Sequence, residues 1–208
     1  MTEPLDTTSD RRPGGRTARV RARVLDAVRA ELAERGHEGL TMEGVATRAG
    51  VHRATVYRRW RDVGGLLVDV IAAAGETDWQ PPDTGSLRDD LTALNQEIQE
   101  SLVEQPSFAV ALMAASFHSE QAARAQTQLW ADRYAQCETL VERAVERGEL
   151  PARHTDARSL LIAATAPLYH QLVLLRADPD PHLPKRAAEA AVLAAAAGAF
   201  RVRREEGV

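Results

Sequence analysis

The segment LTMEGVATRAGVHRATVYRRW, residues 40–60, constrains the fold of this 208-residue chain more than any other stretch. It predicts two short helices joined by a tight turn. Thr41 can cap the first helix, because its hydroxyl can accept a hydrogen bond from an exposed backbone N–H of the first turn. Gly50 can end that helix because glycine tolerates a positive φ, and Val51 supplies an apolar side chain beneath the turn.

The second helix of this segment, expected from about residue 53 to residue 59, keeps its polar side chains on the outside. Val56 occupies its buried face and Trp60 follows it, while Arg, Thr and Tyr occupy the outer faces. A short helix of this composition, held out from a crossing helix, suits the major groove of DNA. An ordinary corner between two helices is the alternative, and the flanking residues favour the helix-turn-helix.

With these flanks, the segment resembles the N-terminal domain of TetR-family transcriptional regulators over about fifty residues, from Arg19 to Leu67. The residues that carry the resemblance are Thr41–Met42, Val45–Ala46, Ala49–Gly50–Val51, Ala54–Thr55–Val56–Tyr57–Arg58–Arg59–Trp60 and Leu66–Leu67. The resemblance implies a repressor that binds a palindromic DNA operator as a homodimer and is released by a small-molecule effector. Val63 departs from the family pattern, which usually has a phosphate-binding Lys there, and Arg61 could replace that contact.

The candidate DNA-binding residues combine the outer faces of the second helix with polar residues around it. Arg53 and Thr55 are expected at base edges, and Tyr57 and Arg58 at phosphates or the groove floor. His52 could serve either purpose. The full set is Arg16, Thr41, Arg48, His52, Arg53, Ala54, Thr55, Tyr57, Arg58 and Arg61.

The charge distribution places DNA binding at one end of the chain. The net charge is −4, yet residues 1–61 hold 13 arginines against 8 acidic residues. The remainder holds 13 basic against 22 acidic residues. A basic head on an acidic body confines nucleic-acid binding to the head. We expect a disordered basic arm at 1–15, a DNA-binding domain at 16–62, and a ligand-binding and dimerisation domain at 63–208.

The hydrophobic pattern predicts an all-α fold of about nine helices, because helix formers dominate and no alternating strand pattern is sustained. The later expected helices cover about residues 62–75, 86–102, 106–117, 120–147, 156–176 and 183–204. The helix at 106–117 is almost wholly apolar, so we expect it to be buried, with Pro106 in its first turn. Gly64 and Gly65 lower the helix propensity at the start of the 62–75 helix, so we interpret this turn as a pivot for the head.

The last two expected helices are apolar nearly all round, and one helical layer beneath them cannot bury such a surface. Two copies of the pair packed as a four-helix bundle would bury it, so we predict a homodimer through these helices. Burial inside one subunit is the alternative. Residues 148–174 also resemble the C-terminal region of one TetR subgroup, and Pro167 is expected to kink its helix. The candidate interface residues are Leu161, Leu168, Leu172, Ala187, Ala191, Ala194 and Gly198.

Aromatic and polar side chains in the body are expected to line a pocket for an unknown small-molecule effector. The alternative for about half of them is ordinary core packing. The candidates are Met113, Phe117, His118, Trp130, Tyr134, Tyr169 and His170.

Other functional classes find little support in the sequence. It contains no HExxH, GxSxG, P-loop or GxGxxG motif and its six histidines are scattered, so we expect no catalytic residue, metal or cofactor. The single cysteine, the polar N-terminal segment and the absence of a ~20-residue apolar run predict a cytoplasmic protein without a membrane span. A helical protein-interaction scaffold without DNA binding, or a small helical enzyme, remain as alternatives.

Overall fold

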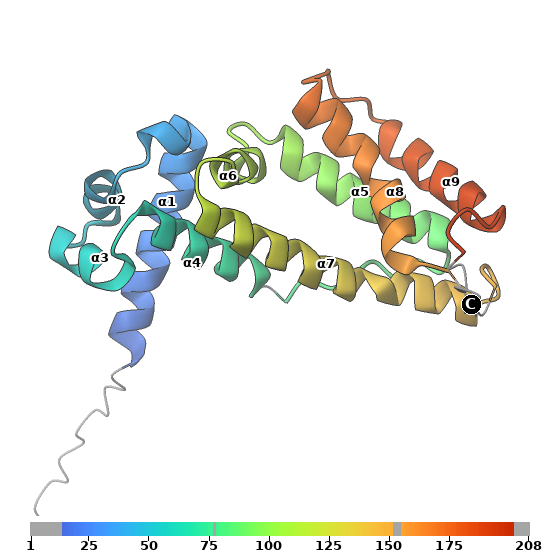
Figure 1. Ribbon diagram of the computed structural model, residues 1–208, viewed down its shortest axis with the longest axis horizontal. Coiled ribbons are helices and arrows are strands. Elements are labelled where there is room, and N and C mark those ends of the chain that lie inside the picture. The colour runs from blue at the N-terminus through green and yellow to red at the C-terminus, as the bar shows by residue number, and fades with distance from the viewer. Residues whose placement is uncertain (1–13, 77, 152–154, 202–208) are drawn as a thin grey trace, which may run out of the picture.

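The computed structural model describes residues 14–76, 78–151 and 155–201. This part of the chain is all-α and contains no strand, which confirms the predicted fold class (Figure 1). Its nine α-helices and one π-helical turn are α1 (Gly14–Gly39), α2 (Met42–Ala49), α3 (Arg53–Trp60), α4 (Val63–Gly75), α5 (Leu87–Val103), α6 (Phe108–Ser116), α7 (Glu120–Glu146), α8 (Ala157–Tyr169), η1 (His170–Leu174) and α9 (Leu183–Ala196).

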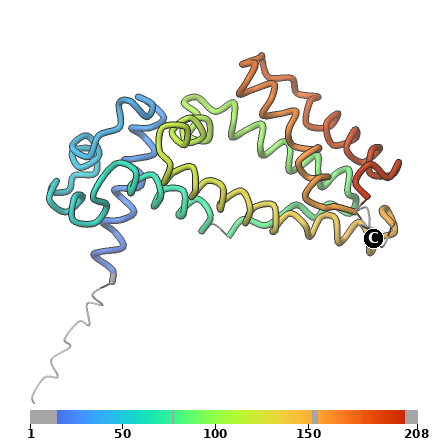
Figure 2. Tube along the Cα trace, in the orientation of Figure 1, coloured from blue at the N-terminus to red at the C-terminus, as the bar shows by residue number. Residues whose placement is uncertain are grey.

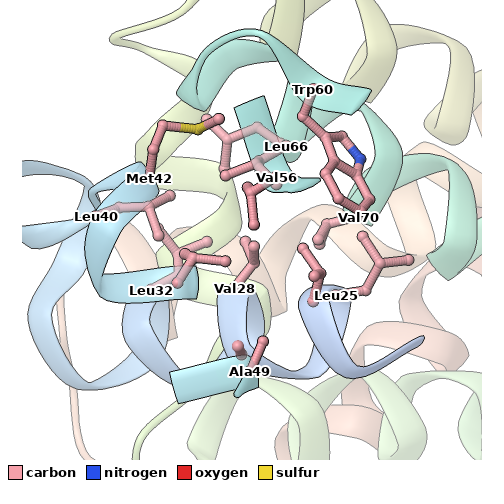
Figure 3. Packing of buried hydrophobic residues seen from close by; sticks show 14 of the residues in the cluster. Leu25, Val28, Leu32, Leu40, Met42, Ala49, Val56, Trp60, Leu66 and Val70 are labelled. Carbon is pink, nitrogen blue, oxygen red and sulfur yellow. The ribbon is translucent and has the colours of Figure 1, made fainter. Parts of the chain in front are cut away.

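Helices α1 to α4 form the head at one end of the molecule (Figure 1). The apolar stripe of α1, which includes Val24, Val28 and Leu32, is fully buried. Val56 of α3 and Leu66 of α4 lie over it (Figure 3). Burial of such a contiguous stripe removes apolar surface from water and is the main stabilising term for the head.

Helix α1 begins earlier than the sequence predicts. Its first residue is Gly14, so Gly14 and Gly15 lie in its first turn rather than in the disordered arm predicted for residues 1–15. The remaining residues assigned to that arm, 1–13, lie outside the described part of the chain. At the other end, Gly36 adopts a non-helical φ of 68° and interrupts α1, as expected for a glycine at this position.

The head core continues into the body. Leu112 and Ala115 of α6 and Ala122 of α7 belong to the same buried cluster as Leu67 and Ile71 of α4. Helix α4 lies along the N-terminal half of α7 (Figure 2). Because one continuous core spans the head and the body, a displacement of α6 or α7 should also displace α4.

The body is a bundle of α5, α7, α8 and α9 around a second core. Leu91 of α5, Leu140 of α7 and Leu160 of α8 are fully buried in it. Asn95 is also fully buried, and its Nδ2 donates to the carbonyl oxygens of Ala164 and Pro184, each at 3.0 Å. One amide group therefore ties α5 to both of the last two helices.

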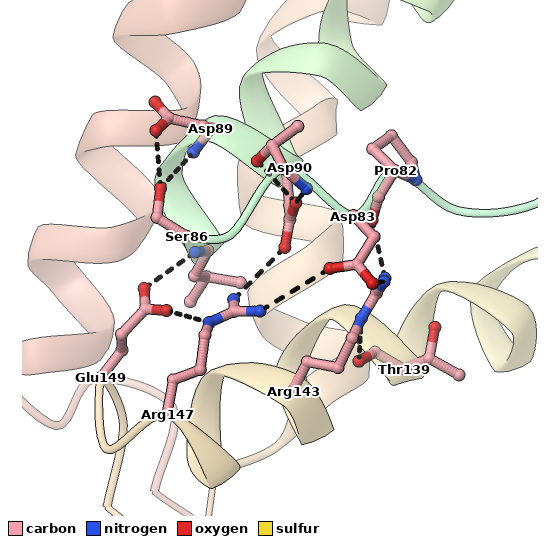
Figure 4. Close-up of polar contacts among 11 residues, drawn as sticks. Pro82, Asp83, Ser86, Asp89, Asp90, Thr139, Arg143, Arg147 and Glu149 are labelled. Carbon is pink, nitrogen blue, oxygen red and sulfur yellow. Dashed lines mark hydrogen bonds and ion pairs between the residues drawn. The ribbon is translucent and has the colours of Figure 1, made fainter.

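A polar network holds the far end of the bundle together (Figure 4). The guanidinium of Arg147 lies 3.3 Å from the buried carboxylate of Asp90 and also contacts Glu149. Glu149 in turn accepts from the backbone N–H of Leu87 at 2.8 Å. Because Asp90 is fully buried, its charge requires donors, which Arg147 and the backbone N–H and hydroxyl of Thr84 supply. The network fixes the start of α5 against the end of α7.

Three expected helix features are corrected. Ser107, not Pro106, defines the start of α6, because its Oγ accepts from the Val110 N–H at 3.2 Å. Helix α6 is only partly buried: Leu112 and Ala115 are inside, whereas the others are half-buried or exposed. Helix α9 ends at Ala196, before Gly198, which adopts a φ of 81°.

The helix predicted for residues 156–176 is α-helical only to Tyr169 and continues as the π-helical turn η1. Pro167 lies inside α8, three residues before this change. Since proline cannot donate the hydrogen bond that the preceding turn requires, a change of helix type directly after it is physically reasonable.

Candidate nucleic-acid interface and small-molecule cavity

Helices α2 and α3 meet in the turn that the sequence predicts. Thr41 Oγ1 accepts from the backbone N–H of Gly44 at 3.0 Å and caps α2. Gly50 adopts the left-handed conformation, with φ 61° and ψ 39°. The backbone N–H of Val51 then donates to the Ala46 carbonyl at 3.0 Å and closes the turn. This is the geometry of a helix-turn-helix.

Helix α3 buries one face and exposes the other. Val56 and Trp60 face the head core, with exposed fractions of 0% and 5%. Thr55 is half-buried at the edge of this face. The remaining candidates of the segment that follow the turn are exposed, namely His52, Arg53, Ala54, Tyr57, Arg58 and Arg61. Since α3 contains no acidic residue, its outer surface is basic and polar.

A hollow of about 550 Å³ lies between α3 and the first turns of α1. Arg16, Arg58 and Arg59 line it together with Thr55. Three guanidinium groups around one concave surface are suited to bind a DNA phosphate. Arg59 is absent from the sequence-based candidates, and the Arg58–Arg59 pair was the only signal for it.

Two exposed candidates already have partners inside the head. Arg48 Nε donates to the buried carboxylate of Glu31 at 2.7 Å, and its NH1 donates to Glu34 at 2.8 Å. Tyr57 OH donates to Glu43 Oε1 at 2.7 Å. This hydrogen bond raises the pKa of Tyr57 and lowers the pKa of Glu43. Arg48 is therefore part of the link between α1 and α2, and Tyr57 is held in a fixed orientation on the surface of α3.

Asp69 of α4 fixes α3 against the rest of the head. Its Oδ1 accepts from Arg21 of α1 at 2.7 Å, and its Oδ2 accepts from the Trp60 indole at 2.8 Å. Burial raises the pKa of Asp69, but the hydrogen bonds from Arg21 and Trp60 outweigh it, so the pKa lies below its ordinary value. The carboxylate thus remains charged and joins three helices at neutral pH.

The glycine pair at the start of α4 has a packing role that the pivot interpretation did not consider. A Cβ atom on Gly65 would lie 2.3 Å from the carbonyl oxygen of Trp60. A Cβ atom on Gly64 would lie 2.7 Å from Oε1 of Gln121 on α7. Asp62 caps the same turn by accepting from the Gly65 N–H at 2.8 Å. Gly65 allows the end of α3 to approach α4 closely, which explains this glycine without a soft turn, whereas the neighbour of Gly64 is the end of a flexible side chain that can move aside.

The body contains a cavity of about 460 Å³, which we call the body cavity. Three of the seven ligand-pocket candidates line it, Trp130, Tyr134 and Tyr169. The ring of Trp130 meets that of Tyr169 edge-on, with centroids 5.6 Å apart. Burial raises the pKa of Tyr169 well above its ordinary value, so its hydroxyl is neutral.

The other four candidates lie elsewhere. Met113 and Phe117 line a separate groove between α6 and η1, and the Phe117 side chain is 86% exposed. His118 stacks on His37 with ring centroids 5.0 Å apart. His170 is exposed at the start of η1. Helical spacing could not separate these residues from the cavity, because several helices converge at angles that the sequence does not reveal.

Other residues that line the body cavity were not among the candidates. They are mainly the aromatic residues Trp79 and Phe108, the charged residues Arg29, Glu97 and Arg133, and Thr165 and Cys137. Arg29 belongs to α1 and Ala74, another lining residue, to α4, so head helices form part of the wall. Burial raises the pKa of Cys137 to about 11, so its thiol is protonated and acts as a packing group, as expected.

Four dimer candidates lie inside the subunit rather than on its surface. Leu161 and Leu168 of α8 and Ala187 and Ala191 of α9 are at most 5% exposed, because they pack between α5, α8 and α9. They cannot contact a partner, and these assignments are wrong. Leu172, Ala194 and Gly198 are half-buried. The exposed residues of α8 and α9 instead include Ile162, Ala166, Ala190 and Leu193, and Ala197, directly after α9, is exposed as well.

In the part of the chain that the structure describes, no three His, Cys, Asp or Glu side chains converge as metal ligands would. None of the described helices combines the length and the apolar character that a membrane crossing requires.

Both parts of the molecule match known protein families. Residues 24–70 match the family described as bacterial regulatory proteins, tetR family. Residues 81–191 match the tetracyclin repressor-like C-terminal domain. The first match contains the helix-turn-helix, and the second covers the residues that form most of the body cavity.

Individual proteins of known sequence or structure are also similar to this chain. The HTH-type transcriptional regulator AqdR of Rhodococcus erythropolis is 31% identical over 190 residues, which cover 90% of this chain and 89% of AqdR. A TetR-family regulator from Mesorhizobium loti superposes with a TM-score of 0.66 at 18% identity, covering 90% of this chain and 99% of the other. MexZ, a repressor from Pseudomonas aeruginosa, superposes with a TM-score of 0.61 at 21% identity, covering 88% and 98%. At these identities the two structures establish similarity of fold alone.

Proposed function

Because this chain belongs to the TetR family of bacterial transcriptional regulators, we propose that it acts as a homodimeric repressor controlled by a small molecule. The dimer binds a palindromic operator through α3 and releases it when a ligand fills the body cavity. The chain is thus a regulator and not an enzyme, and its place of action is the cytoplasm, where operator DNA is found.

The exposed basic surface of α3 is the observation that carries the DNA-binding part of the proposal. Arg53 and Tyr57 project from a helix whose other face is anchored by Val56 and Trp60. Anchoring fixes the orientation of α3, so less conformational entropy is lost when its exposed side chains contact DNA. The three arginines of the neighbouring hollow supply the phosphate contacts that set the register of the helix on the duplex.

Two heads on one palindrome require a two-fold interface, and the outer face of α8 and α9 fits this purpose. Ile162 and Leu193 are 42% and 71% exposed, although both are large apolar side chains. Around them the exposed residues Ala166, Ala190 and Ala197 allow close approach of another helix. Exposed apolar patches of this kind mark protein–protein contacts. A partner subunit is the occupant that a palindromic operator requires.

The position of the body cavity supports the proposal of ligand control. Arg29 of α1 and Ala74 of α4 contribute to its wall, so a bound molecule touches the two helices that carry the head. A ligand regulates only if it favours one arrangement of the heads over another. A difference of about 1–3 kcal/mol is sufficient for a roughly 5–150-fold change in operator affinity.

A gel shift with the intergenic DNA upstream of the chain's own coding sequence tests the DNA-binding proposal. We expect a specific complex that unlabelled specific DNA displaces and unrelated DNA does not. A helical scaffold without DNA binding would give no specific complex. Adding small-molecule extracts to the complex of the purified dimer and DNA in the same assay tests whether a ligand releases the DNA. A ligand that releases DNA must, by reciprocity, bind more weakly to the DNA-bound protein than to the free protein.

The dimer interface is tested by Ile162→Glu combined with Leu193→Glu. Both side chains are exposed in one subunit, so the subunit should still fold, while two charges per chain should separate the dimer. Sedimentation should then show a monomer and the gel shift should disappear. Ala135→Glu, on the exposed surface of α7, is the matched control and should leave the dimer intact. A double variant that remains dimeric would exclude this surface as the interface.

A further inference from the structure

The body cavity has an unusually complete aromatic wall. Five rings surround it, those of Trp79, Phe108, Trp130, Tyr134 and Tyr169. Flat faces and edges at this density suit a ligand that is itself a flat aromatic ring system, because offset and edge-on ring contacts add to the burial of apolar area. A cavity of about 460 Å³ lies in the range that encloses small organic molecules.

Basic side chains outnumber acidic ones in the wall of the body cavity, and they have fewer partners within the protein. Glu97 is the one acidic side chain in its wall, and it already accepts from the Trp79 indole at 2.7 Å. Arg133 and Arg29 carry two positive charges. Among the described residues, Arg133 has no carboxylate within ion-pair distance, and Arg29 pairs only with the exposed Asp26 at 3.5 Å. The cavity therefore holds an excess of uncompensated positive charge.

Arg133 is held in a way that leaves its donors free. Its guanidinium lies over the ring of Trp79, 4.3 Å from the centroid. Stacking occupies the face of the planar group, whereas its N–H donors lie in the plane and point outwards. Within the described part of the chain its one hydrogen bond is a long contact of 3.4 Å to Gln136 on the same helix. A stacked guanidinium with unused in-plane donors is prepared for a carboxylate.

The same contacts argue against a cationic ligand. Aromatic cages bind cations through the faces of their rings. Here three rings already have a guanidinium over one face, with Arg133 over Trp79, Arg29 over Phe108 and Arg158 over Tyr134. A further cation would meet like charges as well as occupied rings.

We propose that the effector of this regulator is an aromatic monoanion, with its ring system among Trp130, Tyr134 and Tyr169 and its carboxylate or similar anion on Arg133. This inference rests on the proposed function, because it specifies the ligand of the same cavity. Arg29 supplies the connection to the head. It extends from α1, whose neighbouring residue Val28 is fully buried in the head core, so attraction of the anion for Arg29 acts directly on the helix that supports α3.

A charge series of one ring system tests the inference by calorimetry on the full-length dimer. The probes are 2-naphthoate, the neutral 2-naphthamide and the cationic 2-naphthylmethylammonium, which share the ring and differ in charge. We expect naphthoate to bind roughly tenfold more tightly than the amide, because a charged hydrogen bond is exchanged for a neutral one. The ammonium should bind most weakly. Arg133→Met should abolish the preference for naphthoate, because methionine keeps an apolar side chain of similar length but carries no charge.

Arg124→Met is the matched control, because Arg124 lies on the exposed surface of the same helix and pairs with Glu120, one turn away. It should preserve the preference. Equal or tighter binding of the amide or the ammonium, or an unchanged preference in Arg133→Met, would overturn the inference and leave the proposed regulator intact. Absence of binding by all three probes would overturn both the inference and ligand control. Loss of the specific gel shift without any probe would instead contradict the DNA-binding proposal.

Discussion

The indole Nε1 of Trp60, the last residue of α3, donates a 2.8 Å hydrogen bond to the carboxylate of Asp69 on α4. Arg21 of α1 donates to the other oxygen of the same carboxylate. Helix α3 is thus joined through Asp69 to both α1 and α4. A movement of α4 should therefore carry α3 with it, because separating the two helices would remove one of the two residues that donate to this partly buried carboxylate.

Trp60→Phe should therefore destabilise the head. The substitution keeps an aromatic ring in the core but removes the donor to Asp69 and some apolar area. We expect a loss of about 1–3 kcal/mol in the free energy of unfolding, measured by urea denaturation. Trp79→Phe is the control, because its indole donates to the exposed Glu97 and should cost less. If both variants lose the same free energy of unfolding, the Trp60–Asp69 hydrogen bond contributes no stability beyond that of ring packing.

The stability contributed by Asp69 should depend on pH in one direction. Its folded pKa lies below the ordinary value of 3.8, so the charged form stabilises the fold. This contribution is fully present above the unfolded pKa and is lost as the pH falls through the folded pKa. The difference in unfolding free energy between the wild type and Asp69→Asn should be constant between about pH 7 and 5 and shrink below about pH 4. A difference that grows on acidification would contradict this assignment.

Gly65→Ala separates the packing role of the glycine pair from the pivot interpretation. A soft turn would be stabilised by alanine, by roughly 1 kcal/mol of helix propensity. The 2.3 Å approach to the Trp60 carbonyl predicts the opposite sign, a loss of about 1–3 kcal/mol from overpacking. Gly15→Ala is the control, because nothing lies within 4 Å of its added Cβ. Denaturation of both variants decides the question, and a stabilised Gly65→Ala would restore the pivot.

Much of this molecule follows from local patterns in the sequence. The cap at Thr41, the turn at Gly50 and the buried Val56 depend on contacts within a few residues, and spacing reveals such contacts. The body cavity depends on how distant helices converge. Trp130, Tyr134 and Tyr169 were found because they are aromatic, whereas Arg29 was missed because it looks like another surface residue of a basic helix.

The last two helices illustrate the same limit. Their apolar character predicts burial on more than one side, whereas within the subunit each helix buries one face and exposes the other. Which side faces the subunit interior depends on α5, whose contribution the sequence does not reveal. Leu161 and Ala191 are therefore internal, while Ile162 and Leu193, one or two positions away, are exposed. A step of one or two residues on a helix rotates the side chain by about 100–200°.

Arg48→Gln should report on stability more than on DNA contacts. The guanidinium links Glu31, whose side chain is 4% exposed, with Glu34. Its removal takes a donor from the buried Glu31 and leaves the ion pair with Arg35, so we expect a lower free energy of unfolding, measured by urea denaturation. At temperatures where the variant is folded, the salt dependence of operator binding should equal that of the wild type. A salt slope reduced by about one would instead assign Arg48 to a phosphate.

The central claim is that α3 reads the operator, and the affinity ratio between operator and unrelated DNA tests it most directly. Fluorescence anisotropy should compare the wild type with a variant that combines Arg53→Ala, Thr55→Ala and Tyr57→Phe. Arg124→Ala with Thr127→Ala, on the exposed face of α7, serves as the control. We predict that the control keeps the wild-type ratio and that the α3 variant binds operator and unrelated DNA alike, since each base contact contributes about 1–3 kcal/mol of discrimination. A folded α3 variant with an unchanged ratio would contradict the account.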